Sequence, residues 1–190
     1  MNEEYPPDIK DMTALLAKVK RAAPDGVLAL SYPGDSPLYV RQAKEIGIAA
    51  PFQFVMIGPA IDFFPKLLGA AANDIVTVGH WTPARNARAR AFHDAYVARF
   101  KEKPDYLDSL ESYVSCEILE QAVGAAGLDR AKLRGAIARG TFETVNGPIR
   151  FEGVENAVTR TGFLQLQNGA PQQVWPLAEA TAKYRPKTAW

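Results

Sequence analysis

The sequence predicts an α/β protein in which a parallel sheet is followed by a block of helices and a C-terminal β hairpin. Three short apolar runs recur roughly every 20–25 residues, at 27–31, 52–57 and 74–78, and each ends in turn residues. Amphipathic segments lie between these runs, as expected for strand–helix–strand units. From 83 to 139 only helical patterns are found, and three strands are few for so many helices.

Helical spacing and terminating residues define the elements of residues 1–80. Apolar side chains at helical spacing predict a first helix, which the sequence Ala23-Pro24-Asp25-Gly26 ends. Gly47 suits the left-handed position that follows a second helix, and Gly69 stops a third. The predicted order is helix 11–22, strand 27–31, helix 36–46, strand 52–57, helix 61–68 and strand 74–78.

The second half of the chain begins with helices and returns to strands. Helices are predicted at about 84–101, 107–125 and 129–139, and the middle one is apolar along one side. Beyond Gly140, alternating patterns predict short strands at 148–151, 162–167 and 173–175. Asn168-Gly169 is a strong signal for the two-residue turn of a hairpin. The tail from 178 to 190 is predicted to be irregular.

Composition argues against several classes of partner. The 190 residues carry a formal net charge of +1, so neither nucleic acid nor an anionic membrane is expected as a partner. No window approaches the roughly 18 apolar residues of a membrane span, and the acidic start MNEEYPPDIK does not read as a secretory signal. A chain expressed as given is therefore expected in the cytoplasm.

Sequence motifs for catalysis and metal binding are not found. There is no G-x-S-x-G, no phosphate-binding loop, no dinucleotide-binding glycine pattern and no H-E-x-x-H. His80, His93 and the single Cys116 do not have the spacing of metal ligands, and Cys116 is predicted to be a buried structural thiol. We therefore predict no catalytic residue, no metal and no cofactor.

The turn after the first strand is the first candidate site. Ligands of parallel α/β sheets bind at the carboxyl ends of the strands. The residues at that end, which are predicted to contact a ligand, are Tyr32, Pro33, Gly34, Asp35 and Ser36. The alternative is an ordinary turn in which Ser36 caps the next helix.

Short segments in a fixed order along the whole chain carry a family resemblance. They are Ala23-Pro24-Asp25, Tyr32-Pro33, VMIGPA at 55–60, Ser112-Tyr113, TVNGPI at 144–149 and Trp175-Pro176. With these segments, the sequence resembles the substrate-binding proteins of ABC transporters for branched-chain amino acids, the Leu/Ile/Val-binding type.

The resemblance implies the type I periplasmic-binding-protein fold, in which two α/β lobes close on a ligand like a Venus flytrap. Members of the family are about twice as long, so the chain corresponds to their C-terminal half. By this resemblance, residues 1–80 form a second-lobe segment and residues 81–140 are helices of the first lobe. Residues 141–190 form a β segment that returns to the second lobe.

Further ligand contacts are implied by the resemblance. They are the turn Gly58-Pro59-Ala60, Trp81 at a crossing between lobes, and Tyr113 on a helix that faces the cleft. Each has a structural alternative: a turn shaped by glycine and proline, a packing aromatic, and a member of an apolar helix side. Amino-acid-binding members place a carboxylate near Ala60. Alanine at this position favours a neutral or anionic ligand, such as an aromatic acid.

We expect the chain to be the ligand-binding component of an ABC-type uptake system, present as a truncated fragment. Its partners would be a small-molecule ligand, either an amino acid or an aromatic or aliphatic carboxylate, and an ABC permease if the protein is full length. The resemblance implies a periplasmic location. The alternatives are a ligand-sensing regulatory domain of the same fold, and a small α/β enzyme with an unrecognised site.

The helix predicted at 107–125 suggests self-association. In the family the helical block packs against the first-lobe sheet, which has no counterpart here. The apolar side of this helix would then face water, so a homo-oligomer is predicted, with Tyr113, Val114, Ile118 and Leu119 near the contact. The alternative is that the helices fold back onto the sheet of residues 27–78.

Overall fold

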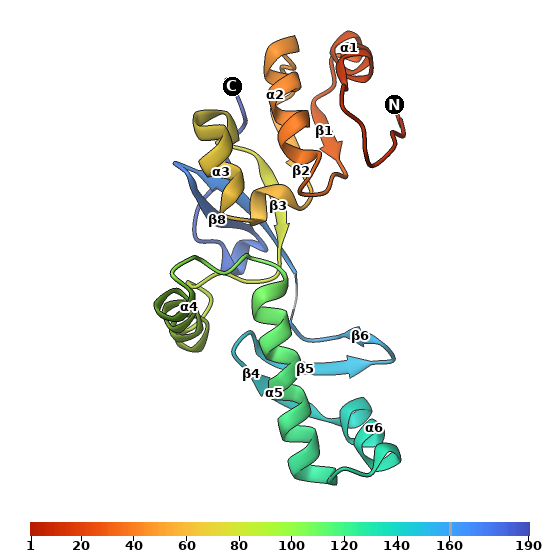
Figure 1. Cartoon of the computed structure of the whole chain (residues 1–190), viewed down its shortest axis with the longest axis vertical. Helices are drawn as coiled ribbons and strands as arrows, with labels where there is room; N and C mark the ends of the chain where they lie inside the picture. The colour runs from red at the N-terminus through yellow and green to blue at the C-terminus, as the bar shows by residue number, and fades with distance from the viewer. Residues whose placement is uncertain (160) are drawn as a thin grey trace. The chain divides into compact units, whose positions relative to one another are not determined.

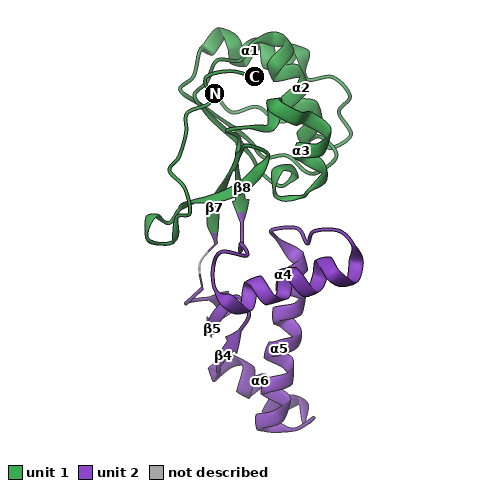
Figure 2. Ribbon diagram, turned by 90° about the vertical axis from the view of Figure 1, so that its left-hand side faces the viewer, with its two compact units in different colours: residues 1–78, 162–190 green, residues 79–161 purple. Residues whose placement is uncertain are grey.

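The computed structural model describes residues 1–159 and 161–190, and its contacts divide the chain into two units (Figure 2). Unit 1 comprises residues 1–78 and 162–190, and unit 2 comprises residues 79–161. The chain therefore passes between the units twice. Neither described range contains a helix that is long and apolar enough to cross a membrane.

Unit 1 is built on the predicted sheet. Strands β1 (Gly26–Ala29), β2 (Phe52–Val55) and β3 (Val76–Gly79) alternate with helices along the chain (Figure 1). β1 and β3 both pair in parallel with β2, and the antiparallel hairpin of β7 (Gly162–Gln167) and β8 (Ala170–Trp175) completes the order β1-β2-β3-β7-β8. Asn168 and Gly169 both have the positive φ that the hairpin turn requires. The predicted α/β fold class is confirmed.

Helices cover one face of this sheet. α1 (Thr13–Ala22), α2 (Ser36–Ile46) and α3 (Phe63–Leu68) contribute buried apolar side chains, and so do alternate residues of the strands. The shared core includes Leu16, Val40, Phe64, Ala29, Val55 and Ile75. Because successive strand side chains point to opposite faces, Leu28 lies on the other face, where it is exposed.

The C-terminal tail is irregular beyond a short 3-10 turn, yet hydrogen bonds hold it to unit 1. The indole of Trp190 donates to the carbonyl of Ile48 at 2.8 Å. Lys187 is buried, and its Nζ donates to the carbonyls of Ala71 and Asn73 at 3.2 and 2.8 Å. Burial lowers the pKa of Lys187 from 10.5 to about 8.

The free energy of unfolding is expected to rise by about 2 kcal/mol between about pH 8 and pH 10. The pKa of Lys187 is lower in the folded protein than in the unfolded one. In this window the unfolded state therefore binds the proton more tightly, and stability increases with pH. At still higher pH the trend reverses, because burial raises the pKa of Tyr39 and the unfolded state loses that proton first.

Urea titrations at both ends of this window measure the change. Lys187→Met is expected to remove the rise, whereas the exposed Lys183→Met is expected to keep it. A wild-type stability that falls over the window would contradict the buried position of Lys187.

Unit 2 combines three helices with a separate antiparallel sheet. The helices are α4 (Ala87–Phe100), α5 (Asp108–Ala126) and α6 (Arg130–Arg139), and the strands are β4 (Thr141–Thr144), β5 (Gly147–Glu152) and β6 (Glu155–Asn156). Their core gathers Trp81, Leu110, Val114, Ile118, Phe142, Val145 and Ile149. Unit 2 thus has a hydrophobic core of its own.

The apolar side of α5 does not face water. Val114 is 2% exposed and Ile118 is 9% exposed, because they pack in one cluster with Phe142 and Ile149 of the antiparallel sheet. The expectation that Val114 and Ile118 lie at an oligomer contact is therefore wrong. Cys116 is exposed, so the prediction of a buried thiol is also wrong. It lies two residues from both Val114 and Ile118, which places it on the opposite side of the helix.

The two units differ from the predicted segments 1–80, 81–140 and 141–190 by two residues at the first boundary and by a longer stretch after residue 140. Residues 141–159 belong to unit 2 together with its helices, whereas residues 162–190 belong to unit 1 together with residues 1–78. Phe142 and Ile149 account for this difference, because they complete the core of unit 2. The assignment of each segment to a lobe of the family stays a prediction.

Candidate functional site

The turn that follows β1 is fixed by a local hydrogen-bond network. The hydroxyls of Ser31 and Ser36 lie 2.8 Å apart, and Ser36 donates to the carbonyl of Tyr32 at 2.5 Å. The backbone N–H of Tyr32 donates to Asp35 Oδ1 at 2.7 Å. Asp35 occupies the cap position of α2 and Ser36 is the first helical residue, so the alternative with Ser36 as the cap does not describe this turn.

Tyr5 also contributes to this turn, although it lies 30 residues before Asp35 in the sequence. Its hydroxyl donates to Asp35 Oδ2 at 2.6 Å. Burial and this hydrogen bond raise the pKa of Tyr5. No sequence pattern points to Tyr5, because it lies in a polar N-terminal segment without periodicity.

The second predicted turn, Gly58–Ala60, packs directly against the first. A Cβ atom on Gly58 would lie 2.5 Å from Cβ of Ser36 and 3.0 Å from Cδ2 of Phe64. Only glycine, which has no Cβ, allows this approach. The two turns at the carboxyl ends of β1 and β2 are therefore interlocked.

Because the two turns pack against each other, most of the predicted ligand-contact residues of unit 1 are buried from solvent. Those that are buried are Asp35, Ser36, Gly58, Pro59 and Ala60. Tyr32 is 65% exposed, Gly34 is exposed and Pro33 is half-buried. A ligand can therefore touch residues 32–34 without any rearrangement of the turns.

Trp81 and Tyr113 belong to an aromatic cluster in unit 2. Trp81 is fully buried, and its Nε1 donates to the carbonyl of Asp105 at 3.1 Å. The ring of Phe92 lies 5.6 Å from that of Trp81 and 5.2 Å from that of Tyr113. Tyr113 is half-exposed and accessible to a ligand, whereas Trp81 occupies the packing position considered as its alternative.

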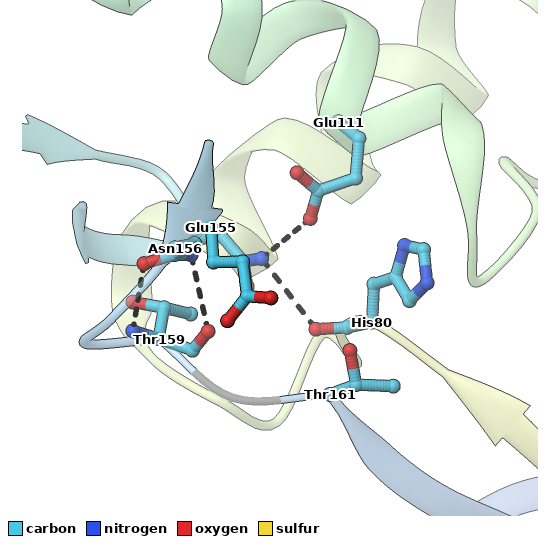
Figure 3. Close-up of a pocket in the computed structure, with 7 residues that line it drawn as sticks. His80, Glu111, Glu155, Asn156, Thr159 and Thr161 are labelled. Carbon is cyan, nitrogen blue, oxygen red and sulfur yellow. Dashed lines mark hydrogen bonds between the residues drawn. The ribbon is translucent and has the colours of Figure 1, made fainter. Parts of the chain in front are cut away.

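Unit 2 also contains a polar pocket of about 470 Å³ that the sequence did not reveal (Figure 3). The amide of Asn146 donates to Glu111 Oε1 at 2.7 Å and to the carbonyl of His80 at 3.5 Å. The lining residues are His80, Glu111, Asn146, Glu155, Asn156, Thr159 and Thr161. They come from separate segments and share no regular spacing, so no motif could predict the pocket.

The pocket has an acidic character. Burial raises the pKa of Glu111, although His80 and the hydrogen bond from Asn146 act in the opposite direction. Glu155 adds a second carboxylate, and among the described residues the buried Asn146 Oδ1 finds no hydrogen-bond partner. Such a lining can hold hydroxyl or ammonium groups. Within residues 1–159 and 161–190 no three side chains of the metal-binding kinds are grouped as a site.

Comparison with known proteins identifies relatives of the whole chain. A family model described as periplasmic binding protein matches residues 1–170. The chain is 25% identical to Leu/Ile/Val-binding protein homolog 7 of Brucella melitensis, over 97% of this chain and 49% of that protein. It is 26% identical to the leucine-, isoleucine-, valine-, threonine- and alanine-binding protein of Pseudomonas aeruginosa, over 75% of this chain and 38% of that protein. The chain thus spans about half the length, or less, of these relatives.

Solved structures share the fold. The leucine-binding protein LivK of Thermotoga maritima has a TM-score of 0.75 and 22% identity, covering 87% of this chain and 48% of that one. LivJ of Streptococcus pneumoniae, in complex with isoleucine, has a TM-score of 0.75 and 24% identity, covering 88% of this chain and 48% of that one. A solute-binding protein of R. palustris, in complex with benzoate, has a TM-score of 0.74 and 22% identity, covering 96% of this chain and 50% of that one.

Proposed function

The chain belongs to the periplasmic binding protein family, and we propose that it supplies part of the ligand-binding surface of an ABC-type solute uptake system. The observation that carries this proposal is the pair of interlocked turns at the carboxyl ends of β1 and β2, with Tyr32 exposed beside them. Strand ends of this kind are where parallel α/β sheets bind ligands. A periplasmic location and an ABC permease as partner of the full-length protein belong to the same proposal.

We propose a carboxylate, aromatic or aliphatic, as the ligand. An α-amino acid needs a negative group for its ammonium, and at the turns of unit 1 the resemblance puts the buried Ala60 where amino-acid-binding members have a carboxylate. The nearby Asp62 is already paired with Lys66 at 2.5 Å. The exposed ring of Tyr32 offers an apolar surface on which an aromatic acid can stack. The benzoate complex of the R. palustris relative supports this ligand class.

Calorimetric titration of the chain with benzoate, leucine, isoleucine and valine tests the proposal. We expect saturable binding of benzoate in the millimolar range, because small-molecule pockets normally bury most of their ligand and this chain spans about half of its relatives. We expect no saturable binding of the three amino acids. Micromolar binding of any of them would contradict the ligand class, and the absence of binding by all four would contradict the proposed function.

Tyr32→Ala is expected to weaken benzoate binding about threefold to tenfold, which corresponds to the loss of one aromatic contact. The melting temperature should stay nearly unchanged, because the Tyr32 side chain is mostly exposed. Leu67→Ala, at an exposed position of α3, is the matched control and should change neither quantity. A large fall in melting temperature with intact binding would show that Tyr32 is a packing residue.

A further inference from the structure

Part of one face of the unit 1 sheet has no covering layer among the described residues. Helices α1, α2 and α3 pack on the opposite face. Sheets with parallel strands are normally covered on both faces. On the open face, at the β1 end of the sheet, Leu28 and Leu30 are both 66% exposed.

The exposed leucines belong to a set of apolar side chains that crosses the sheet. Leu28 is in register with Phe54 on β2, so these two residues share a face. The ring of Phe54 lies 5.9 Å from that of Phe163 on β7, and the ring of Phe163 lies 5.6 Å from that of Trp175 on β8. We call this set the apolar row: Leu28, Leu30, Phe54, Phe163 and Trp175.

The two ends of the apolar row differ in kind. Its β1 end is formed by the two leucines, and its β8 end is formed by Phe163 and Trp175, which are 41% and 46% exposed. β1 and β8 are the outermost strands of the sheet (Figure 1). The row therefore has an aliphatic half and an aromatic half on opposite sides of the sheet.

We propose that the apolar row binds the same row of a second copy of this chain. A two-fold axis through the middle of the row places the aliphatic half of each copy on the aromatic half of the other. Two-fold dimers, in which both subunits contribute the same surface patch, are the commonest homo-oligomers. With a net charge of only +1, two copies repel each other little.

The exposed area fits a weak dimer. A fully exposed aromatic side chain offers roughly 150–250 Å², so the exposed fractions of Phe163 and Trp175 leave roughly 100 Å² each. Leu28 and Leu30 add a similar area. The pair of copies thus buries roughly 800 Å² from these residues, which falls in the size range of weak, transient contacts. We therefore expect a dissociation constant in the micromolar range.

Light scattering of the chain over a dilution series tests this dimer. The wild type is expected to be dimeric at about 100 μM and to dissociate on dilution. Leu28→Lys and Trp175→Lys should each weaken the dimer at least about tenfold, because each places an ammonium group in an apolar contact. Both positions are exposed in the single chain, so circular dichroism and melting temperature should report an intact fold. Leu128→Lys, at an exposed position of unit 2, is the control and should leave the dimer unchanged.

Several results would overturn the proposal. One is a monomer mass for the wild type at about 100 μM. Another is a dimer that survives both lysine substitutions, or one that Leu119→Lys on α5 breaks and Leu28→Lys does not. A dimer that is broken by Leu28→Lys but kept by Trp175→Lys would overturn the two-fold overlay of the row. None of these outcomes depends on ligand binding, so the test is independent of the proposed function.

Discussion

Ile118→Asp is expected to unfold unit 2, with a loss of roughly 4 kcal/mol or more in its free energy of unfolding. Ile118 is 9% exposed, and it shares a core with Val114, Phe142 and Ile149. A carboxylate at this position would be buried in an apolar cluster without a partner. The melting temperature should fall by roughly 10 °C or more. It is measured by circular dichroism at 222 nm, a helix-sensitive wavelength, because α5 carries much of the helix of unit 2.

The neighbouring residue provides the matched control. Leu119 is 49% exposed on the same helix, so Leu119→Asp should change the free energy of unfolding by only about 0.5 kcal/mol. Equal losses for the two variants would contradict the described packing of α5 against β4 and β5. A folded but dissociated Ile118→Asp variant would instead place Ile118 at a contact between chains.

The sequence predicted the first eighty or so residues well, because local signals and packing agree there. β1 is a short apolar run between Gly26 and a turn, and its parallel pairing follows from that pattern. The same pattern predicts a fully buried strand, which is wrong, because Leu28 and Leu30 are each 66% exposed on the face that the helices do not cover. The hairpin of β7 and β8 followed from Asn168-Gly169, because few other dipeptides tolerate positive φ at both positions.

β4 was missed because its local signal is weak. Residues 141–144 have the sequence TFET, with Phe142 as the only large apolar side chain, and they form a strand only through pairing with β5. The same omission led to the error at Val114 and Ile118. Without a strand at 141–144, the side of α5 that carries them had no predicted partner.

The sequence predicted which turns form the candidate site, but not which residues of those turns are exposed. Strand ends locate residues 31–36 and 58–60 from the sequence alone, since parallel strands bring their carboxyl ends to one edge. Burial of Ser36 and Ala60 depends on how closely the two turns approach, which is a tertiary property. Tyr5 and the pocket around Glu111 depend on contacts between distant segments, which periodicity cannot reveal.

Gly58→Ala is expected to lower the free energy of unfolding of unit 1 by about 2–3 kcal/mol. The added Cβ would lie 2.5 Å from Cβ and 2.8 Å from Oγ of Ser36, and 3.0 Å from the ring of Phe64. Neither neighbour can move aside easily, because both are fully buried. The turns must therefore separate, which also displaces Tyr32, so the affinity for benzoate should fall together with the stability. Urea denaturation and calorimetry measure the two effects.

A double-mutant cycle identifies the clash as the cause. Ser36→Gly removes both of the closest atoms, so the cost of Gly58→Ala should be much smaller in the Ser36→Gly background than in the wild type. Gly34→Ala in the first turn is the control and should cost little, because no atom lies within 4 Å of its added Cβ. An equal cost of Gly58→Ala in both backgrounds would mean that the turns are not interlocked through Ser36. The site at the ends of β1 and β2 would then have to be built differently.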